Sequence, residues 1–260
     1  MTSWLRTLLL GVAVALLVGC ATHVRAPAAP PASAEAALAA WSRVLGGFVN
    51  DEGEVDFEAL AADRADLDRY VRHLADTPLD SLADGPPRLA HMVNAYNALS
   101  MFNVLESGIP DSHAGWNKLR FFVLREFDIG GERRSLYRFE NDLIRPAFRR
   151  LDDPRVHFAL NCSARACPRL PRQPFSAAAL DAELERETRA FFALPQNFRI
   201  DAAARTAWLS ELLAFYPVDF VPRPAASLLA YASRYSPQPA PADFQVRFTP
   251  YDWRIANSRR

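Results

Sequence analysis

The chain lacks an excess of charge of either sign and has few cysteines. Its 30 basic and 30 acidic residues give a formal net charge of zero, so no long-range attraction to nucleic acid is expected. Only three cysteines are present, Cys20, Cys162 and Cys167. The sequence also contains no Gly-rich phosphate loop, no G-x-S-x-G elbow and no H-E-x-x-H motif, so nothing in it indicates a bound cofactor.

The apolar run near the amino terminus is too short for a comfortable membrane span. Leu8 to Val18 covers roughly a dozen residues, whereas a spanning helix needs about 20. Arg6 precedes the run and Leu17-Val18-Gly19-Cys20 ends it, a pattern typical of a lipoprotein signal peptide. We expect cleavage before Cys20 and anchoring to the membrane through lipid, including palmitate, on that cysteine. The alternative is an uncleaved membrane anchor.

The composition after Cys20 indicates a tether followed by one folded domain. Residues 22–33 are rich in alanine and proline, and such a stretch tends to be extended because it cannot bury a core. Ala21, in place of an aspartate, favours the outer membrane, with the domain facing the periplasm. We therefore expect a signal peptide over 1–19, a lipidated tether over 20–33 and a single globular domain over 34–260.

Strands and helices are expected without regular alternation, which favours an α+β fold with a buried central helix, surrounding helices and short antiparallel strands or hairpins. The buried helix, 88–107, is apolar on almost every side. It nevertheless carries Asn94, Asn97 and Asn103, whose amides must hydrogen-bond to loops packed around it. The other expected elements are helices over 34–45, 57–74, 135–145, 176–194, 211–216 and 225–231, strands over 121–128, 156–160 and 244–248, and hairpins at Gly130-Gly131 and over 198–208.

The residues best suited to carry out chemistry form one cluster, in which Cys162 and Cys167 follow His157. The first interpretation is a disulfide, because removing the lipidated cysteine leaves an even number in an oxidising compartment. The second is a thiol nucleophile beside a histidine base, with the other cysteine as a resolving thiol. The third is a metal site, but the spacing is not that of a standard zinc site and a fourth ligand is missing.

Either cysteine could be the nucleophile under the second interpretation, with His157 as the base. Asp252 or Asn94 could orient that histidine as the third member of the arrangement. Asp252 more often has a structural role in such a position, capping a turn while its aromatic neighbours pack on the core. His91 and His113 are weaker candidates, the first as a core histidine and the second in a loop.

Several segments together resemble a bacterial family known as domain of unknown function 547. Val93-Asn94-Ala95-Tyr96-Asn97-Ala98-Leu99 is similar to its I-N-A-Y-N-A-L helix. The stretch from Ser135 through Glu140 to Pro146, the cluster from His157 to Leu170, and Tyr251-Asp252-Trp253 with Asn257 resemble its other motifs, in the same order. The resemblance covers roughly 55–257. Local departures are His91-Met92 in place of an aromatic pair, and one extra residue before Asn257.

The resemblance implies an envelope protein of undefined activity and puts a set of residues together. Beside the three cluster residues, the set contains Asn94, Tyr96, Asn97, Glu140, Tyr251, Asp252, Trp253 and Asn257. One economical hypothesis is that the buried helix packs under the cysteine loop and orients it.

Two functions remain open at this point. The first is a thiol-dependent hydrolase or transferase acting on an envelope peptide, amide or thioester. The alternative is a non-catalytic lipoprotein that binds an envelope protein or peptide, with Cys162–Cys167 as a structural disulfide.

Overall fold

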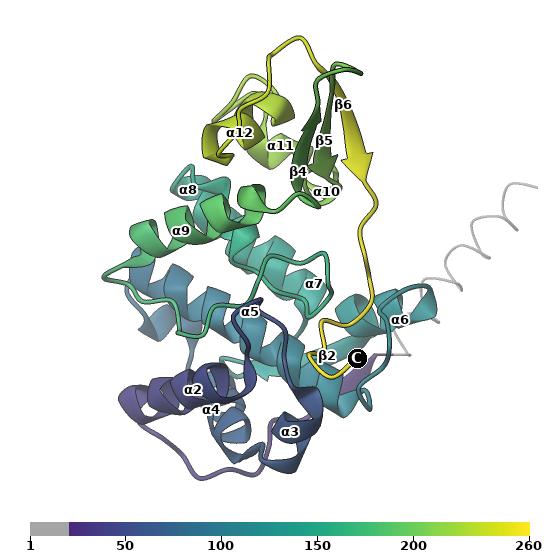
Figure 1. Ribbon diagram of the computed structural model, residues 1–260. Helices are drawn as coiled ribbons and strands as arrows, with labels where there is room; N and C mark the ends of the chain where they lie inside the picture. Colours follow the sequence, from purple (N-terminus) through teal and green to yellow (C-terminus); the bar gives the residue numbers. More distant parts are fainter. Residues whose placement is uncertain (1–20) are drawn as a thin grey trace, which may run out of the picture.

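The computed structural model describes residues 21–260 (Figure 1). The expected signal peptide and the lipidation site Cys20 lie outside the described residues. Helices surround a central helix, and two small sheets of three strands each lie apart from one another, which confirms the α+β class. Within the described range, no helix is long and apolar enough to cross a membrane.

The central element is α5 (Pro86–Glu106), in which every residue from Met92 to Val104 is buried. It begins after Gly85, at φ +86°, with proline at its first positions, where a missing N–H costs nothing. Gly108, at φ +75°, follows its carboxyl end. The helix that is apolar on all sides is therefore the core of the molecule, as its sequence predicts.

The buried amides of α5 do hydrogen-bond to loops packed around the helix. Asn94 accepts from Trp41 Nε1 at 3.3 Å and exchanges two hydrogen bonds with the backbone of Phe175, at 2.7 and 3.0 Å. Asn97 donates to the carbonyl of Ala159 at 3.0 Å and accepts from the N–H of Asn161 at 2.8 Å. Asn97 therefore fixes the backbone immediately before Cys162.

The helices α2 (Ala34–Phe48), α3 (Phe57–Ala62) and α4 (Ala65–Asp76) precede α5. Two expectations fail here. The first helix continues through Gly46 and Gly47 to Phe48. The helix expected over 57–74 breaks at Asp63 and Arg64 into α3 and α4, and the break lets α4 pack against α2, where Trp41 stacks on Tyr70 at 5.4 Å.

The first sheet contains β1 (Thr22–Val24), β2 (Arg125–Ile129) and β3 (Glu132–Ser135), in the order β1-β2-β3. The expected hairpin at Gly130-Gly131 joins β2 and β3, and both glycines have positive φ. The segment expected as a tether begins with a strand, because Thr22–Val24 pairs in parallel with β2. The strand expected from residue 121 starts only at Arg125, since a π-helical turn, η2 (Arg120–Leu124), continues from α6 (Trp116–Leu119).

The second sheet has the order β4-β5-β6 and lies at the far end of the molecule from α2–α4 (Figure 1). The expected hairpin consists of β4 (Phe198–Asp201) and β5 (Thr206–Ser210), and β6 (Gln245–Thr249) pairs in parallel with β5. After β6 the chain runs back along the molecule toward β2, where it ends. The short helices between β5 and β6 are α10 (Leu212–Phe215), α11 (Pro217–Phe220) and α12 (Leu228–Tyr235).

Ser135 caps a helix, as expected, but that helix does not stop near Pro146. It comprises α7 (Leu136–Arg138), a π-helical turn η3 (Phe139–Ile144) and α8 (Arg145–Arg150). Pro146 falls in the first turn of α8, where the longer hydrogen-bond register of the π turn has just ended and a missing N–H is tolerated.

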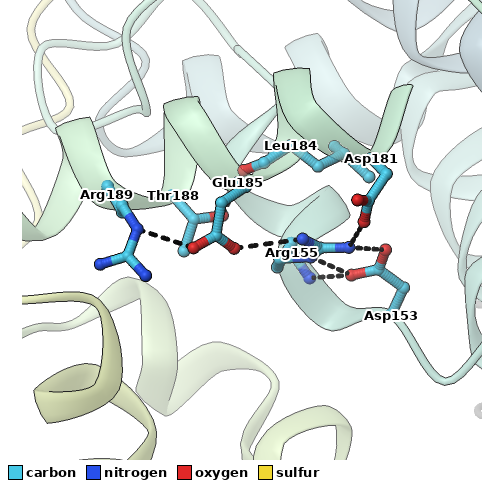
Figure 2. A network of polar contacts seen from close by, with 7 residues as sticks. All are labelled: Asp153, Arg155, Asp181, Leu184, Glu185, Thr188 and Arg189. Carbon is cyan, nitrogen blue, oxygen red and sulfur yellow. Dashed lines mark hydrogen bonds and ion pairs between the residues drawn. The ribbon is translucent and has the colours of Figure 1, made fainter. Parts of the chain in front are cut away.

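The segment expected as a strand over 156–160 is instead a 3₁₀ helix, η4 (Pro154–Phe158). Figure 2 shows how it is held against α9 (Leu180–Ala193). Arg155 binds Asp153 beside it and reaches Asp181 and Glu185 of α9, at 2.6 and 3.1 Å. A short apolar run has no period that distinguishes strand from helix, and this ionic network links the observed 3₁₀ helix to α9. The remaining element is a short 3₁₀ turn, η1 (Leu79–Ser81).

The contacts of Asn97 give a direct test of this packing. Replacing Asn97 with leucine leaves a buried carbonyl and a buried N–H without partners, each worth about 1–3 kcal/mol. We expect Asn97→Leu to lower the free energy of unfolding by about 2–4 kcal/mol in urea titrations. A change within 0.5 kcal/mol of zero would contradict the role given to this amide.

Candidate active site

The cysteine loop, residues 161–168, follows η4 directly. Cys162 and Cys167 form a disulfide with their Cα atoms 6.3 Å apart, which confirms the first interpretation of the cluster. Asn161 closes the loop from inside, because its side chain donates to the carbonyl of Pro168 at 2.7 Å and accepts from the N–H of Ser163 at 2.7 Å. Among the described residues, no group of three or more His, Cys, Asp or Glu side chains is placed to hold a metal ion.

The carboxyl-terminal segment from Tyr251 to Ser258 crosses the loop as a strap. The N–H of Ala256 donates to the carbonyl of Ser163, and the N–H of Arg165 donates to the carbonyl of Arg254, both at 2.8 Å. Beyond this point Asn257 donates to the carboxylate of Glu58 at 2.9 and 3.1 Å. The closing motif of the sequence therefore anchors the cysteine loop to the amino-terminal helices.

The two sulfurs lie in different surroundings. Cys162 is buried, with 6% of its surface exposed, while Cys167 is only partly buried. The Cys167 sulfur accepts from the N–H of Cys162 and from the hydroxyl of Tyr251, each at 3.0 Å. The Cys162 sulfur lies 3.6 Å from the same hydroxyl. Two donors therefore converge on Cys167.

The disulfide lines the inner part of a cleft. This inner part is narrow, about 60 Å³, and it joins an outer part of about 430 Å³ through five residues that line both. The shared residues are Phe122, Glu140, Phe215, Tyr216 and Trp253. Phe122 belongs to η2 and Glu140 to η3, so both π-helical turns of the described chain face the cleft, and such turns are frequent at functional sites.

A carboxylate and three tyrosines line the inner part. The Tyr96 hydroxyl donates to Glu140 at 3.2 Å, and Tyr216 lines the same part beside Glu140. Burial, together with the charge of Glu140, raises the pKa of Tyr96, Tyr216 and Tyr251 well above the ordinary range. All three hydroxyls therefore keep their protons at neutral pH, and those of Tyr96 and Tyr251 donate to Glu140 and to the Cys167 sulfur.

His157 lines the same inner part but is paired with an acid that the sequence did not indicate. Its Nε2 lies 2.9 Å from Asp219, and its ring stacks on Tyr216 at 4.6 Å. Arg145 also donates to Asp219, at 2.8 and 2.9 Å, and Arg149 donates at 2.6 Å. Burial disfavours the charged carboxylate, but these hydrogen bonds more than offset it and hold the pKa of Asp219 well below its usual range.

A comparison with protein-family models gives one match, over residues 80–192, to the family described as "Protein of unknown function, DUF547". Residues 80–192 are therefore similar to that family. Neither the curated proteins nor the solved structures contain a significant match to the chain. The family stretch includes α5, Glu140, His157 and both loop cysteines. The strap with Tyr251 lies outside it, so the match is narrower than the resemblance over 55–257.

The candidate site residues that the sequence motifs suggested do not all lie together. Asp252 accepts from the backbone and side chain of Arg254, at 2.5–3.1 Å, and so closes its own turn. Asn94 is committed to Trp41 and Phe175. Among the described residues, the hydrogen-bond partner of His157 is Asp219 rather than either of these. Asp219 lies 62 positions from His157 in the sequence. The only signal for it is that it is an acidic residue flanked by apolar ones.

A second residue that sequence reasoning passed over is His113. It is buried, its Nε2 lies 2.9 Å from the carbonyl of Cys162, and its N–H donates to the carbonyl of Trp253 at 2.9 Å. His113 therefore joins the cysteine loop to the strap. Burial lowers the pKa of His113 to about 4, with a smaller opposing effect from the Cys162 carbonyl.

The loss of the buried acid gives one test of the cluster. Asp219→Asn leaves His157, Arg145 and Arg149 without a carboxylate, and breaking a buried ion pair in this way costs about 3–5 kcal/mol. We expect a decrease of about 3 kcal/mol in the free energy of unfolding at pH 7. Arg138→Met, which removes an exposed pair with Asp142, is the control and should change stability by under about 0.5 kcal/mol. Equal effects of the two variants would count against the cluster.

The pH dependence of stability tests His113. Its pKa is depressed in the folded state, so between about pH 4 and about pH 6.5 the unfolded state binds more protons, and stability falls as the pH falls. The His113→Gln variant keeps a donor for the Cys162 carbonyl but does not titrate. We expect its unfolding free energy to decline less than that of the wild type between pH 7.5 and 5, by on the order of 1–2 kcal/mol. Parallel declines in urea titrations would show that His113 is not buried in its neutral form.

Proposed function

We propose that this chain is an envelope lipoprotein whose reduced Cys162–Cys167 pair performs thiol-dependent hydrolysis or transfer on a peptide, amide or thioester. The observation that carries the proposal is the position of Cys167, which lines the inner end of a cleft and accepts hydrogen bonds at 3.0 Å from an N–H and from the Tyr251 hydroxyl. Donors at that distance stabilise a thiolate over a thiol.

Cys167 is the better candidate nucleophile of the two. Its sulfur has two donors and is only partly buried, whereas Cys162 is almost fully buried. Burial without charge partners raises a thiol pKa and makes the group inert. Cys162 then serves as the resolving thiol, because the disulfide demonstrates that the two sulfurs reach each other.

The chemistry requires the disulfide to be opened first by an external dithiol, which is oxidised as the pair takes up two electrons and two protons. The Cys167 sulfur then attacks an acyl carbon, and the bond to the leaving group breaks as that group takes the thiol proton. Water hydrolyses the resulting thioester and restores the thiol, or an amine takes the acyl group instead. The Tyr251 hydroxyl, which stays protonated, lies where it can donate to the developing oxyanion.

The arrangement favours a positioning role for His157. Within the described residues, it hydrogen-bonds to Asp219 and to neither cysteine, and it stacks on Tyr216, which lines the cleft together with Glu140. The His157–Asp219 pair therefore holds the tyrosine and carboxylate wall of the cleft.

The envelope part of the proposal rests on the lipoprotein signal-peptide pattern that ends in Cys20. The lipid would anchor the protein to the outer membrane on its periplasmic side. A formed disulfide is compatible with such an oxidising compartment.

The second candidate is a non-catalytic lipoprotein that binds an envelope protein or peptide, with the disulfide as a structural link. The burial of Cys162 and the strap over the loop favour it. A loop this short, however, gains only about 2 kcal/mol of chain-entropy stabilisation from its disulfide. The loop is also held by the hydrogen bonds of Asn161.

Alkylation of single free thiols separates these candidates. Cys162→Ser leaves Cys167 free and keeps the backbone N–H that donates to it, while Cys167→Ser leaves the buried Cys162. We expect the pH dependence of the alkylation rate of Cys167 by iodoacetamide to give a thiol pKa at least about one unit below the 8.5 of a free cysteine. Cys162 should react at least about tenfold more slowly at pH 7. Rates are measured by mass spectrometry across pH 5–10.

Tyr251→Phe in the Cys162→Ser background is the matched variant, since it removes one donor and keeps the ring. It should raise the Cys167 pKa, and far-ultraviolet circular dichroism controls for folding. A Cys167 pKa at or above that of a free cysteine, unaffected by Tyr251→Phe, would leave the structural disulfide as the better account.

A further inference from the structure

The outer part of the cleft holds the only lysine in the chain, Lys118. Its Nζ lies 3.8 Å from the ring centroid of Trp253 and 5.5 Å from that of Phe215. These rings fix an ammonium group at the mouth of the cleft. Among the residues that the structure describes, Lys118 forms no ion pair within 4 Å. Burial lowers the pKa of its ammonium group, and the charge of Glu211 opposes this.

The walls around this cation are apolar and unusually exposed. Tyr137, Val123 and Phe215 line the outer part with 53%, 40% and 37% of their surfaces exposed. Glu140 is the other charged residue of this lining, and its carboxylate already accepts from the Tyr96 hydroxyl. At about 430 Å³, the outer part lies within the range of small-molecule sites. It is suited to an apolar group that carries one negative charge.

The inner part has the opposite character. There the hydroxyl of Tyr216 can donate to a carbonyl oxygen, and Glu140, whose Oε2 accepts from Tyr96, can accept from an N–H through Oε1. A plain hydrocarbon chain would cover the Tyr216 hydroxyl and Oε1 of Glu140 without giving them partners, at a cost that an amide avoids. From its outer to its inner part, the cleft therefore presents a cation, apolar walls, hydrogen-bond partners for an amide and the Cys167 sulfur.

We propose that the cleft binds the carboxyl-terminal end of a peptide or N-acyl amino acid, with the terminal carboxylate on Lys118. The apolar last side chain lies against Phe122, Phe215 and Trp253, and the preceding amide points inward to Glu140 and the Tyr216 hydroxyl. This inference deepens the proposed function and rests on it only for the ligand being a substrate.

Binding to the oxidised protein tests the inference without any thiol chemistry. The probes are N-acetylphenylalanine and its neutral amide, N-acetylphenylalaninamide, measured by isothermal titration calorimetry with the disulfide intact. We expect the carboxylate to bind about tenfold more tightly than the amide, because charge-assisted hydrogen bonds are the stronger ones. Lys118→Met, which keeps the apolar stem, should remove that preference, and Lys118→Arg should retain it.

Arg133→Met is the control, because Arg133 is an exposed cation of the β2–β3 hairpin and does not line the cleft. It should leave the preference unchanged. Equal binding of the two probes to the wild type, or a preference that survives Lys118→Met, would overturn the inference. Tighter binding of decanoate than of N-acetylphenylalanine would also overturn it, since the amide would then contribute nothing.

The two proposals can fail separately. If the wild type shows no preference for the carboxylate probe but Cys167 is reactive, the ligand class is refuted and the thiol chemistry stands. A clear preference with an unreactive Cys167 refutes the thiol chemistry and leaves a binding site.

Discussion

The hydrogen bonds that the amides of α5 make with the surrounding loops are the constraint on which the rest of the structure depends. A helix buried on every side must have its polar side chains satisfied by the segments packed around it. Asn94 meets this need through Trp41 and the backbone of Phe175, and Asn97 through Ala159 and Asn161. The positions of these loops are therefore set by the core.

As a result, two independent sets of hydrogen bonds fix the position of the cysteine loop. Asn97 fixes its start from inside, while the strap and His113 hold it from outside through the backbone of Ser163, Arg165 and Cys162. Tyr251, on the strap, is brought to 3.0 Å from the Cys167 sulfur. The same fold that orients the disulfide thus supplies a neutral hydroxyl beside it.

The sequence predicted those parts of the structure in which one local pattern decides the outcome. The buried helix, the hairpin at Gly130-Gly131 and the Ser135 cap follow from such patterns. The disulfide was one of three interpretations that the sequence left open, and the structure selects it. The sequence could not predict the pairing of His157 with Asp219, because nothing local relates residues 62 positions apart. Nor could it predict η4, which the ionic contacts of Arg155 with α9 place beside the core.

The lining of the cleft was only partly predictable for a related reason. Glu140, Tyr96 and Tyr251 came from motif resemblance, whereas Tyr216 and Lys118 enter through tertiary packing. The π-helical turns that present Phe122 and Glu140 have no reliable sequence signature, and they rotate the side chains away from the face that an α-helical period would assign.

The central claim is that the Cys162–Cys167 pair is reducible and active rather than a fixed link. The most direct test is a redox titration of the protein in glutathione buffers, with free thiols counted by mass spectrometry after alkylation. Stabilisation of the Cys167 thiolate favours the reduced form, so the account predicts a midpoint above about −250 mV. A midpoint below about −300 mV, the range of structural disulfides, would contradict it.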